Sequence, residues 1–80
     1  LNLTVILKEV PKSVMIDLPE VLQQAKLNNM QVDASINHAL GYVYIDVESQ
    51  ETGKTFALAQ LVDVIDYASI GEYVTEIGVE

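Results

Sequence analysis

Two segments in the middle of the chain, 30–37 and 41–48, alternate strictly between apolar and polar residues. A period of two is typical of a β-strand that has one face in the core. Because the connection over 38–41 is short, we expect the two strands to form an antiparallel hairpin. The residues expected to face the core are Val32, Ala34, Ile36, Val43, Ile45 and Val47, and those expected to face outward include Asp33, Tyr42, Tyr44, Asp46 and Glu48.

The two ends of the chain also predict strands. Residues 1–10 are rich in β-branched side chains, and Pro11 ends this strand because proline cannot donate to a strand ladder. We expect Leu3, Val5 and Leu7 to face the core, and Thr4, Ile6 and Lys8 to face outward. Residues 73–79 predict the last strand, with Tyr73, Thr75, Ile77 and Val79 on one side.

A first helix is predicted to begin near Asp17. Asp17 as N-cap with Glu20 three residues later resembles a capping box, and Pro19 is tolerated in a first helical turn. Ile16 and Val21 are expected to form a hydrophobic staple across this start. The apolar stripe would be Leu18, Val21, Leu22 and Ala25, and Asn28-Asn29 would stop the helix. Residues 14–16 are either a short strand or an apolar lead-in.

The segment after Ser49 allows two interpretations. Thr55 can cap a helix over 56–68, whose apolar face would comprise Leu58, Leu61, Val62, Ile65 and Ala68. Alternatively, residues 51–54 are a hairpin turn, and 54–59 pairs with the strand at 41–48. We favour the helix, which Gly71 would end.

The resulting order is β-α-β-β-α-β in a chain of 80 residues. It predicts a single small α+β domain over residues 1–80 with a ferredoxin-like sandwich, in which two helices cover one face of a four-stranded antiparallel sheet. Right-handed crossovers place the first and third strands at the centre. ACT-like and NIL-type regulatory domains share this order, an analogy of architecture alone. The chain starts at Leu1 rather than Met, which is compatible with excision from a larger protein.

Charge and composition narrow the function classes. The chain has four Lys, no Arg and twelve acidic residues, for a net charge of −8. This balance argues against direct binding of nucleic acid or of an anionic membrane, and it would complement a basic protein partner. The absence of cysteine excludes disulfides, thiolate nucleophiles and cysteine-based zinc sites, and it fits a cytoplasmic location.

Candidate catalytic and metal-binding residues are sparse. His38 would need Asp33, Asp46 or Glu48 beside it to act as a base or metal ligand, and a single histidine in a turn is more typical of a solvated residue. Gly53-Lys54-Thr55 matches the end of a phosphate loop, but Glu48 stands where the first glycine is required. We therefore expect no catalytic residue, no metal site and no cofactor.

The outward face of the predicted sheet is the best candidate for recognition. Tyrosine is enriched in protein interfaces, although it also simply favours exposed strands. RNA-binding sheets stack bases on such aromatics, but the neighbouring acids argue against that use here. The predicted partner-binding residues are Ile6, Tyr42, Tyr44, Asp46 and Asp33.

Our first hypothesis is a non-catalytic binding or regulatory module that acts through protein contacts or self-association on this face. The alternative is a stand-alone acidic inhibitor that mimics nucleic acid and masks a basic site. An unidentified small-molecule ligand on the same face is compatible with either hypothesis.

Overall fold

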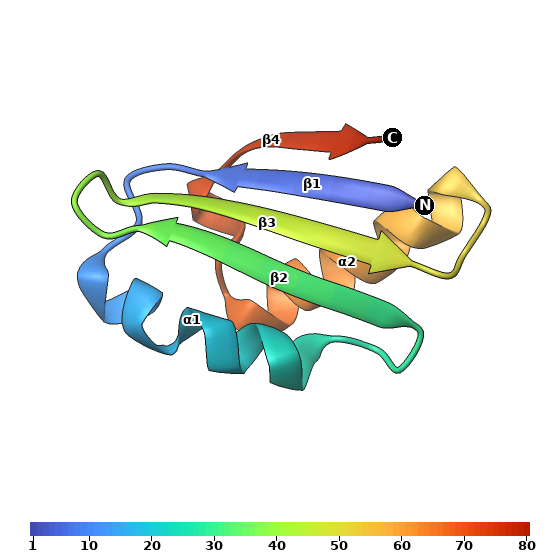
Figure 1. Ribbon diagram of the computed structural model, residues 1–80, viewed down its shortest axis with the longest axis horizontal. Coiled ribbons are helices and arrows are strands. Elements are labelled where there is room, and N and C mark those ends of the chain that lie inside the picture. The colour runs from blue at the N-terminus through green and yellow to red at the C-terminus, as the bar shows by residue number, and fades with distance from the viewer.

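The computed structural model describes all 80 residues. It consists of a four-stranded antiparallel sheet with two helices on one face (Figure 1). The elements are β1 (Asn2–Leu7), α1 (Lys12–Ala25), β2 (Met30–Asn37), β3 (Tyr42–Ser49), α2 (Lys54–Ala68), the 3-10 helix η1 (Gly71–Tyr73) and β4 (Val74–Val79). The strand order β2-β3-β1-β4 places β1 and β3 at the centre, as predicted. The prediction of a ferredoxin-like α+β fold is confirmed.

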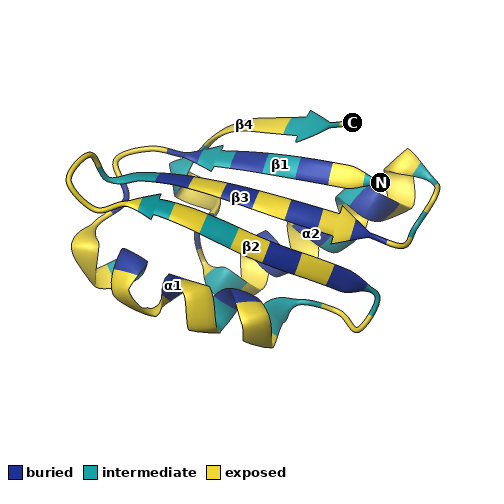
Figure 2. Cartoon of the chain, in the orientation of Figure 1, coloured by how far each residue is buried: buried dark blue, intermediate teal, exposed yellow.

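The core lies between the sheet and the helices. In the central pair, Leu3, Val5 and Leu7 of β1 stand opposite Val47, Ile45 and Val43 of β3, and all six are buried. Buried residues alternate with half-buried or exposed ones along these strands (Figure 2). The helices close the core with Met15, Leu18 and Leu22 from α1 and with Ala57, Leu61 and Val64 from α2. Removing such side chains from water is the main source of stability.

The β2–β3 hairpin is present as predicted, and Gly41 ends its turn. Gly41 has a φ of 66°, a conformation that glycine adopts with little strain. The N–H of Val10 donates to the Gly41 carbonyl at 2.9 Å, and a Cβ on Gly41 would lie 3.1 Å from the Val10 carbonyl oxygen. Glycine is therefore needed here for both its backbone angle and its small size.

The predicted start of α1 is wrong. The helix begins at Lys12, and Pro11 occupies the N-cap position without a side-chain cap. Residues 14–16 are therefore helical, and Ile16 is 71% exposed, so it forms no staple with Val21. The reason is that Met15 shares the buried stripe with Leu18 and Leu22, which extends the amphipathic pattern past Asp17 toward the N-terminus.

The helical interpretation of the next segment is confirmed, and the strand alternative for 54–59 is wrong. The helix α2 begins at Lys54 with Gly53, not Thr55, at the N-cap. It ends in the left-handed conformation of Ser69, before Gly71 is reached. Neither α1 nor α2 combines the length and apolar character needed to cross a membrane.

The buried face of α2 is rotated from the predicted one. Val62 is 47% exposed, whereas Ala57 and Val64 are buried. Phe56 and Tyr67 are also exposed, so the helix carries apolar side chains on both its inner and its outer sides. This distribution makes the apolar period ambiguous, which explains the error.

The last strand is shorter than predicted, and its pairing is interrupted. A register shift between Ile6 and Leu7 leaves Thr75 without a partner on β1, and Tyr73 belongs to η1. The predicted single face of Tyr73, Thr75, Ile77 and Val79 is therefore wrong, because a bulge changes the alternation. The helices pack chiefly on β2 and β1, and β4 contains no buried residue (Figure 2).

Pro19 allows the observed start of α1 to be tested. Pro19 lies inside the helix, where it lacks an N–H to donate to the carbonyl four residues earlier. We expect Pro19→Ala to raise the free energy of unfolding by about 1–3 kcal/mol, measured by urea denaturation. Pro11→Ala is the control, because Pro11 lies outside the helix and its replacement should change stability by less than about 1 kcal/mol. A neutral Pro19→Ala would place the helix start near Asp17 instead.

Candidate functional site

One side of the sheet has no helix over it, since both helices lie on the other side (Figure 1). We call this surface the open face. Its residues alternate with the core residues of the four strands and comprise Thr4, Ile6, Gln31, Asp33, Ser35, Asn37, Tyr42, Tyr44, Asp46, Glu48, Glu76 and Gly78. Because directly opposite residues of antiparallel strands point to the same side, the pairing register fixes which of them are neighbours.

The apolar part of the open face lies on its two central strands. Ile6 of β1 stands directly opposite Tyr44 of β3, and Tyr42 lies further along β3, opposite Asn37. Ile6 and Tyr42 are half-buried, and Tyr44 is 38% exposed. The three predicted apolar residues thus form a short strip, which we call the Ile6–Tyr44 strip.

The two predicted acids of the open face are direct neighbours. Asp46 of β3 stands opposite Asp33 of β2 on one side and opposite Thr4 of β1 on the other. Both carboxylates are exposed. Like charges placed directly opposite in a sheet are destabilising, so this pair weakens the β2–β3 pairing rather than supporting it.

Glu76 belongs to the same surface and was not predicted as a site residue. It stands opposite Ile6 from β4, so Ile6 is flanked by Tyr44 on one side and by a carboxylate on the other. The alternation of Glu76, Ile77 and Gly78 was visible in the sequence. The residue of β1 that stands opposite Glu76 could not be read from the sequence, because the bulge at Thr75 shifts the register.

The other chemical candidates lie apart from this surface. His38 is exposed in the turn between β2 and β3, while Asp33 and Asp46 pair in the body of the hairpin. Gly53, Lys54 and Thr55 form the start of α2. The sequence patterns around them therefore correspond to a turn and to a helix start.

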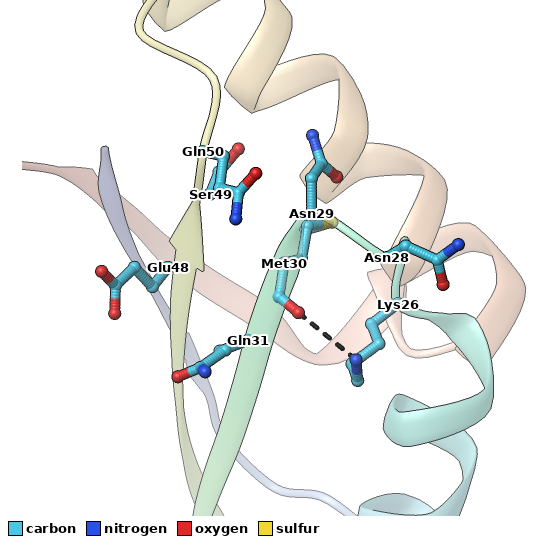
Figure 3. A pocket seen from close by; sticks show the side chains of 8 residues that line it. All are labelled: Lys26, Asn28, Asn29, Met30, Gln31, Glu48, Ser49 and Gln50. Atoms are coloured by element: carbon cyan, nitrogen blue, oxygen red, sulfur yellow. Dashed lines mark hydrogen bonds between the residues drawn. The ribbon is translucent and has the colours of Figure 1, made fainter.

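The largest pocket, of about 320 Å³, lies where α1 ends and β2 begins (Figure 3). It is lined by Lys26, Asn28, Asn29, Met30, Gln31, Glu48, Ser49 and Gln50. The Lys26 ammonium donates to the Met30 carbonyl at 3.3 Å, and the Gln50 N–H donates to the Asn29 carbonyl at 3.0 Å. Glu48 points away from Lys26 (Figure 3). Both hydrogen bonds have backbone acceptors within this chain. They join the residue after α1 and the residue after β3 to the start of β2.

Tyr73, in η1, shows a displaced pKa. Desolvation, and next the adjacent Glu72 carboxylate, raise the pKa of its phenol above the ordinary value. A raised pKa in the folded state favours the neutral form, so its contribution to stability is present at neutral pH and is lost only under alkaline conditions. The open face does not include this group.

A comparison of the chain with protein-family models, with curated proteins and with solved structures finds no match. The fold and the site thus define its class, a ferredoxin-like α+β domain with an uncovered, acidic sheet face. Since a fold of this kind hosts unrelated functions, the function has to be argued from the open face itself.

The opposed aspartates give a prediction about stability. We expect Asp33→Asn and Asp46→Asn each to stabilise the domain by roughly 0.2–0.5 kcal/mol, because each removes the repulsion. In a double-mutant cycle, the second substitution should add little to the first. The gain should shrink at high salt, which screens exposed charges. Loss of stability in either single variant would show that its carboxylate makes a favourable contact.

Proposed function

We propose that this protein is a non-catalytic binding module that holds a cationic, partly apolar segment of a partner protein on its open face. The observation that carries the proposal is the combination of the Ile6–Tyr44 strip with carboxylates from β2, β3 and β4, on a surface that no helix covers. An apolar centre with a charged rim is the usual composition of a protein interface.

The Ile6–Tyr44 strip supplies the apolar contact. Tyrosine offers a large apolar ring with a polar tip and loses little side-chain entropy on binding. The strip lies on the two central strands, whose backbones are paired on both sides and are therefore rigid. A partner side chain can pack on this strip without a rearrangement of the sheet.

The surrounding carboxylates define the charge of the partner. Asp46 lies two residues beyond Tyr44 along β3, with Asp33 of β2 opposite it. Glu76 of β4 stands opposite Ile6. With a net charge of −8, the whole domain attracts cations before contact and raises the association rate. The same charges oppose stacking of two open faces on each other, so they favour a basic partner over self-association through this face.

The alternative of a stand-alone acidic inhibitor uses the same surface differently. It is favoured by the opposed Asp33 and Asp46, whose adjacent charges resemble the closely spaced phosphates of a nucleic acid. An inhibitor of this kind would depend on charge alone. The contribution of Tyr44 therefore distinguishes the two functions.

A binding titration tests the proposal. The probe is a peptide of alternating Arg and Leu, and the matched control peptide alternates Glu and Leu. We expect only the Arg peptide to bind, with chemical-shift changes at the backbone amides of Ile6, Tyr44 and Asp46. Shifts confined to the helices, or equal binding of both peptides, would contradict the proposal.

Substitution and salt separate the module from the inhibitor. We expect Tyr44→Ala to weaken binding of the Arg peptide by about tenfold, corresponding to the loss of one well-packed contact. Tyr67→Ala is the matched control, because Tyr67 is exposed on α2, away from the open face. If Tyr44→Ala leaves the affinity for the Arg peptide unchanged and added salt abolishes binding, the acidic inhibitor is supported instead.

A further inference from the structure

The two edges of the sheet are treated differently. At the β2 edge, the Gln23 side-chain amide donates to the Val32 carbonyl at 2.7 Å, and the Lys26 ammonium donates to the Met30 carbonyl at 3.3 Å. Both donors come from α1 or the residue that follows it. Backbone carbonyls that already accept from side chains are poor templates for another strand, so this helix protects the β2 edge.

The outer edge of β4 has no such protection. The Glu80 N–H donates to the Asn2 carbonyl at 2.9 Å, in the same register as the pair of Leu3 and Val79. Because hydrogen-bonded and non-hydrogen-bonded pairs alternate along antiparallel strands, Ile77 and Val79 direct their N–H and C=O groups away from β1. None of the side-chain hydrogen bonds reaches these groups.

The side chain of Ile77 is also incompletely covered. It stands opposite the fully buried Val5, so it points to the helix side of the sheet, yet it is 42% exposed. The helices pack chiefly on β2 and β1 and leave this end of the core side open. The free edge therefore combines unpaired backbone groups with an apolar side chain that is only partly covered.

We propose that β4 pairs antiparallel with β4 of a second copy of this chain, with the two-fold axis at Ile77. The sheet then runs without interruption through both copies, and all helices lie on the same side. Each Ile77 exchanges two backbone hydrogen bonds with Ile77 of the second copy, and the two side chains cover each other on the helix side.

The charges along β4 favour this register over the two adjacent ones. With the axis at Ile77, Glu76 stands opposite Gly78 of the second copy, and no two carboxylates face each other. Moving the axis to residue 76 would oppose the two Glu76 side chains. Moving it to residue 78 would oppose Glu76 and Glu80. Opposed like charges are destabilising, so these two registers are disfavoured. Registers centred on Thr75 or Val79 also oppose no two carboxylates, but they would separate the two Ile77 side chains, so the charges and the cover of Ile77 together favour the axis at Ile77.

The proposed pairing is independent of peptide binding on the open face. It joins the two open faces edge to edge and leaves both accessible. Two chains of net charge −8 repel each other, so added salt should strengthen the dimer, whereas it should weaken binding of a cationic peptide. The opposite responses to salt allow either proposal to fail alone.

A substitution that removes the backbone N–H donor of residue 77 tests the proposed pairing of the two β4 edges. Proline is accepted on edge strands where the N–H is not needed, and the Ile77 N–H points away from β1. By sedimentation equilibrium we expect the wild-type chain to approach twice its own mass with increasing concentration. Ile77→Pro should raise the dissociation constant at least about tenfold. Ile77→Val, which keeps the donor and a branched side chain, should behave as wild type, and circular dichroism should show all three folded.

Cysteine cross-linking tests the register without relying on proline. The chain has no cysteine, so a single introduced thiol reports only on its own position. Ile77→Cys should form an intermolecular disulfide under mild oxidation, because opposed residues lie about 5.5 Å apart between their Cα atoms. Val79→Cys should not, because the two Val79 positions would lie about 13 Å or more apart along the strands.

Three outcomes would overturn the proposal. The first is a wild-type chain that stays monomeric at every concentration and salt level. The second is a dimer that Ile77→Pro, still folded, does not weaken. The third is cross-linking of Val79→Cys as fast as that of Ile77→Cys, which would show another register or non-specific contact.

Discussion

The register between β1 and β3 decides which side chains this protein buries and which it presents. With Val5 opposite Ile45, the apolar residues of both central strands point toward the helices. Because side chains alternate along a strand, a slip of one residue in either strand would turn its entire apolar set toward water. The helices can pack only on the side that this register makes apolar, so the layer arrangement depends on it.

The same register assembles the open face, and there it acts against stability. It leaves Ile6 beside Tyr44 without a covering layer, and the β2–β3 register brings Asp46 opposite Asp33. Neither arrangement is what a sheet needs for its own folding, since one is repulsive and the other leaves apolar surface in water. Natural proteins commonly accept such local losses of stability where a surface has to bind something.

The edges show a comparable division between protection and availability. Gln23 and Lys26 donate to the edge of β2, whereas the edge of β4 keeps its outward backbone groups and Ile77 uncovered. Unprotected edges invite pairing, and the position of Glu76 and Gly78 restricts which pairing is favourable. The two proposed contacts use the open face and the outer edge of β4, and Glu76 belongs to both, since its side chain lies on the open face next to that edge.

The sequence by itself determined the strands, their order and most of the membership of the open face. Period-two alternation over 30–37 and 41–48 is a local property, so it assigns Tyr44, Asp46 and Asp33 to one surface without any knowledge of long-range contacts. Tertiary packing alone decided that α1 begins at Lys12, because burial of Met15 outweighs the local signal at Asp17. Tertiary packing also decided which edge of the sheet stays free. The hydrogen bond from Gln23 to Val32 protects the β2 edge, and it depends on how α1 packs beside β2, which no local sequence pattern encodes.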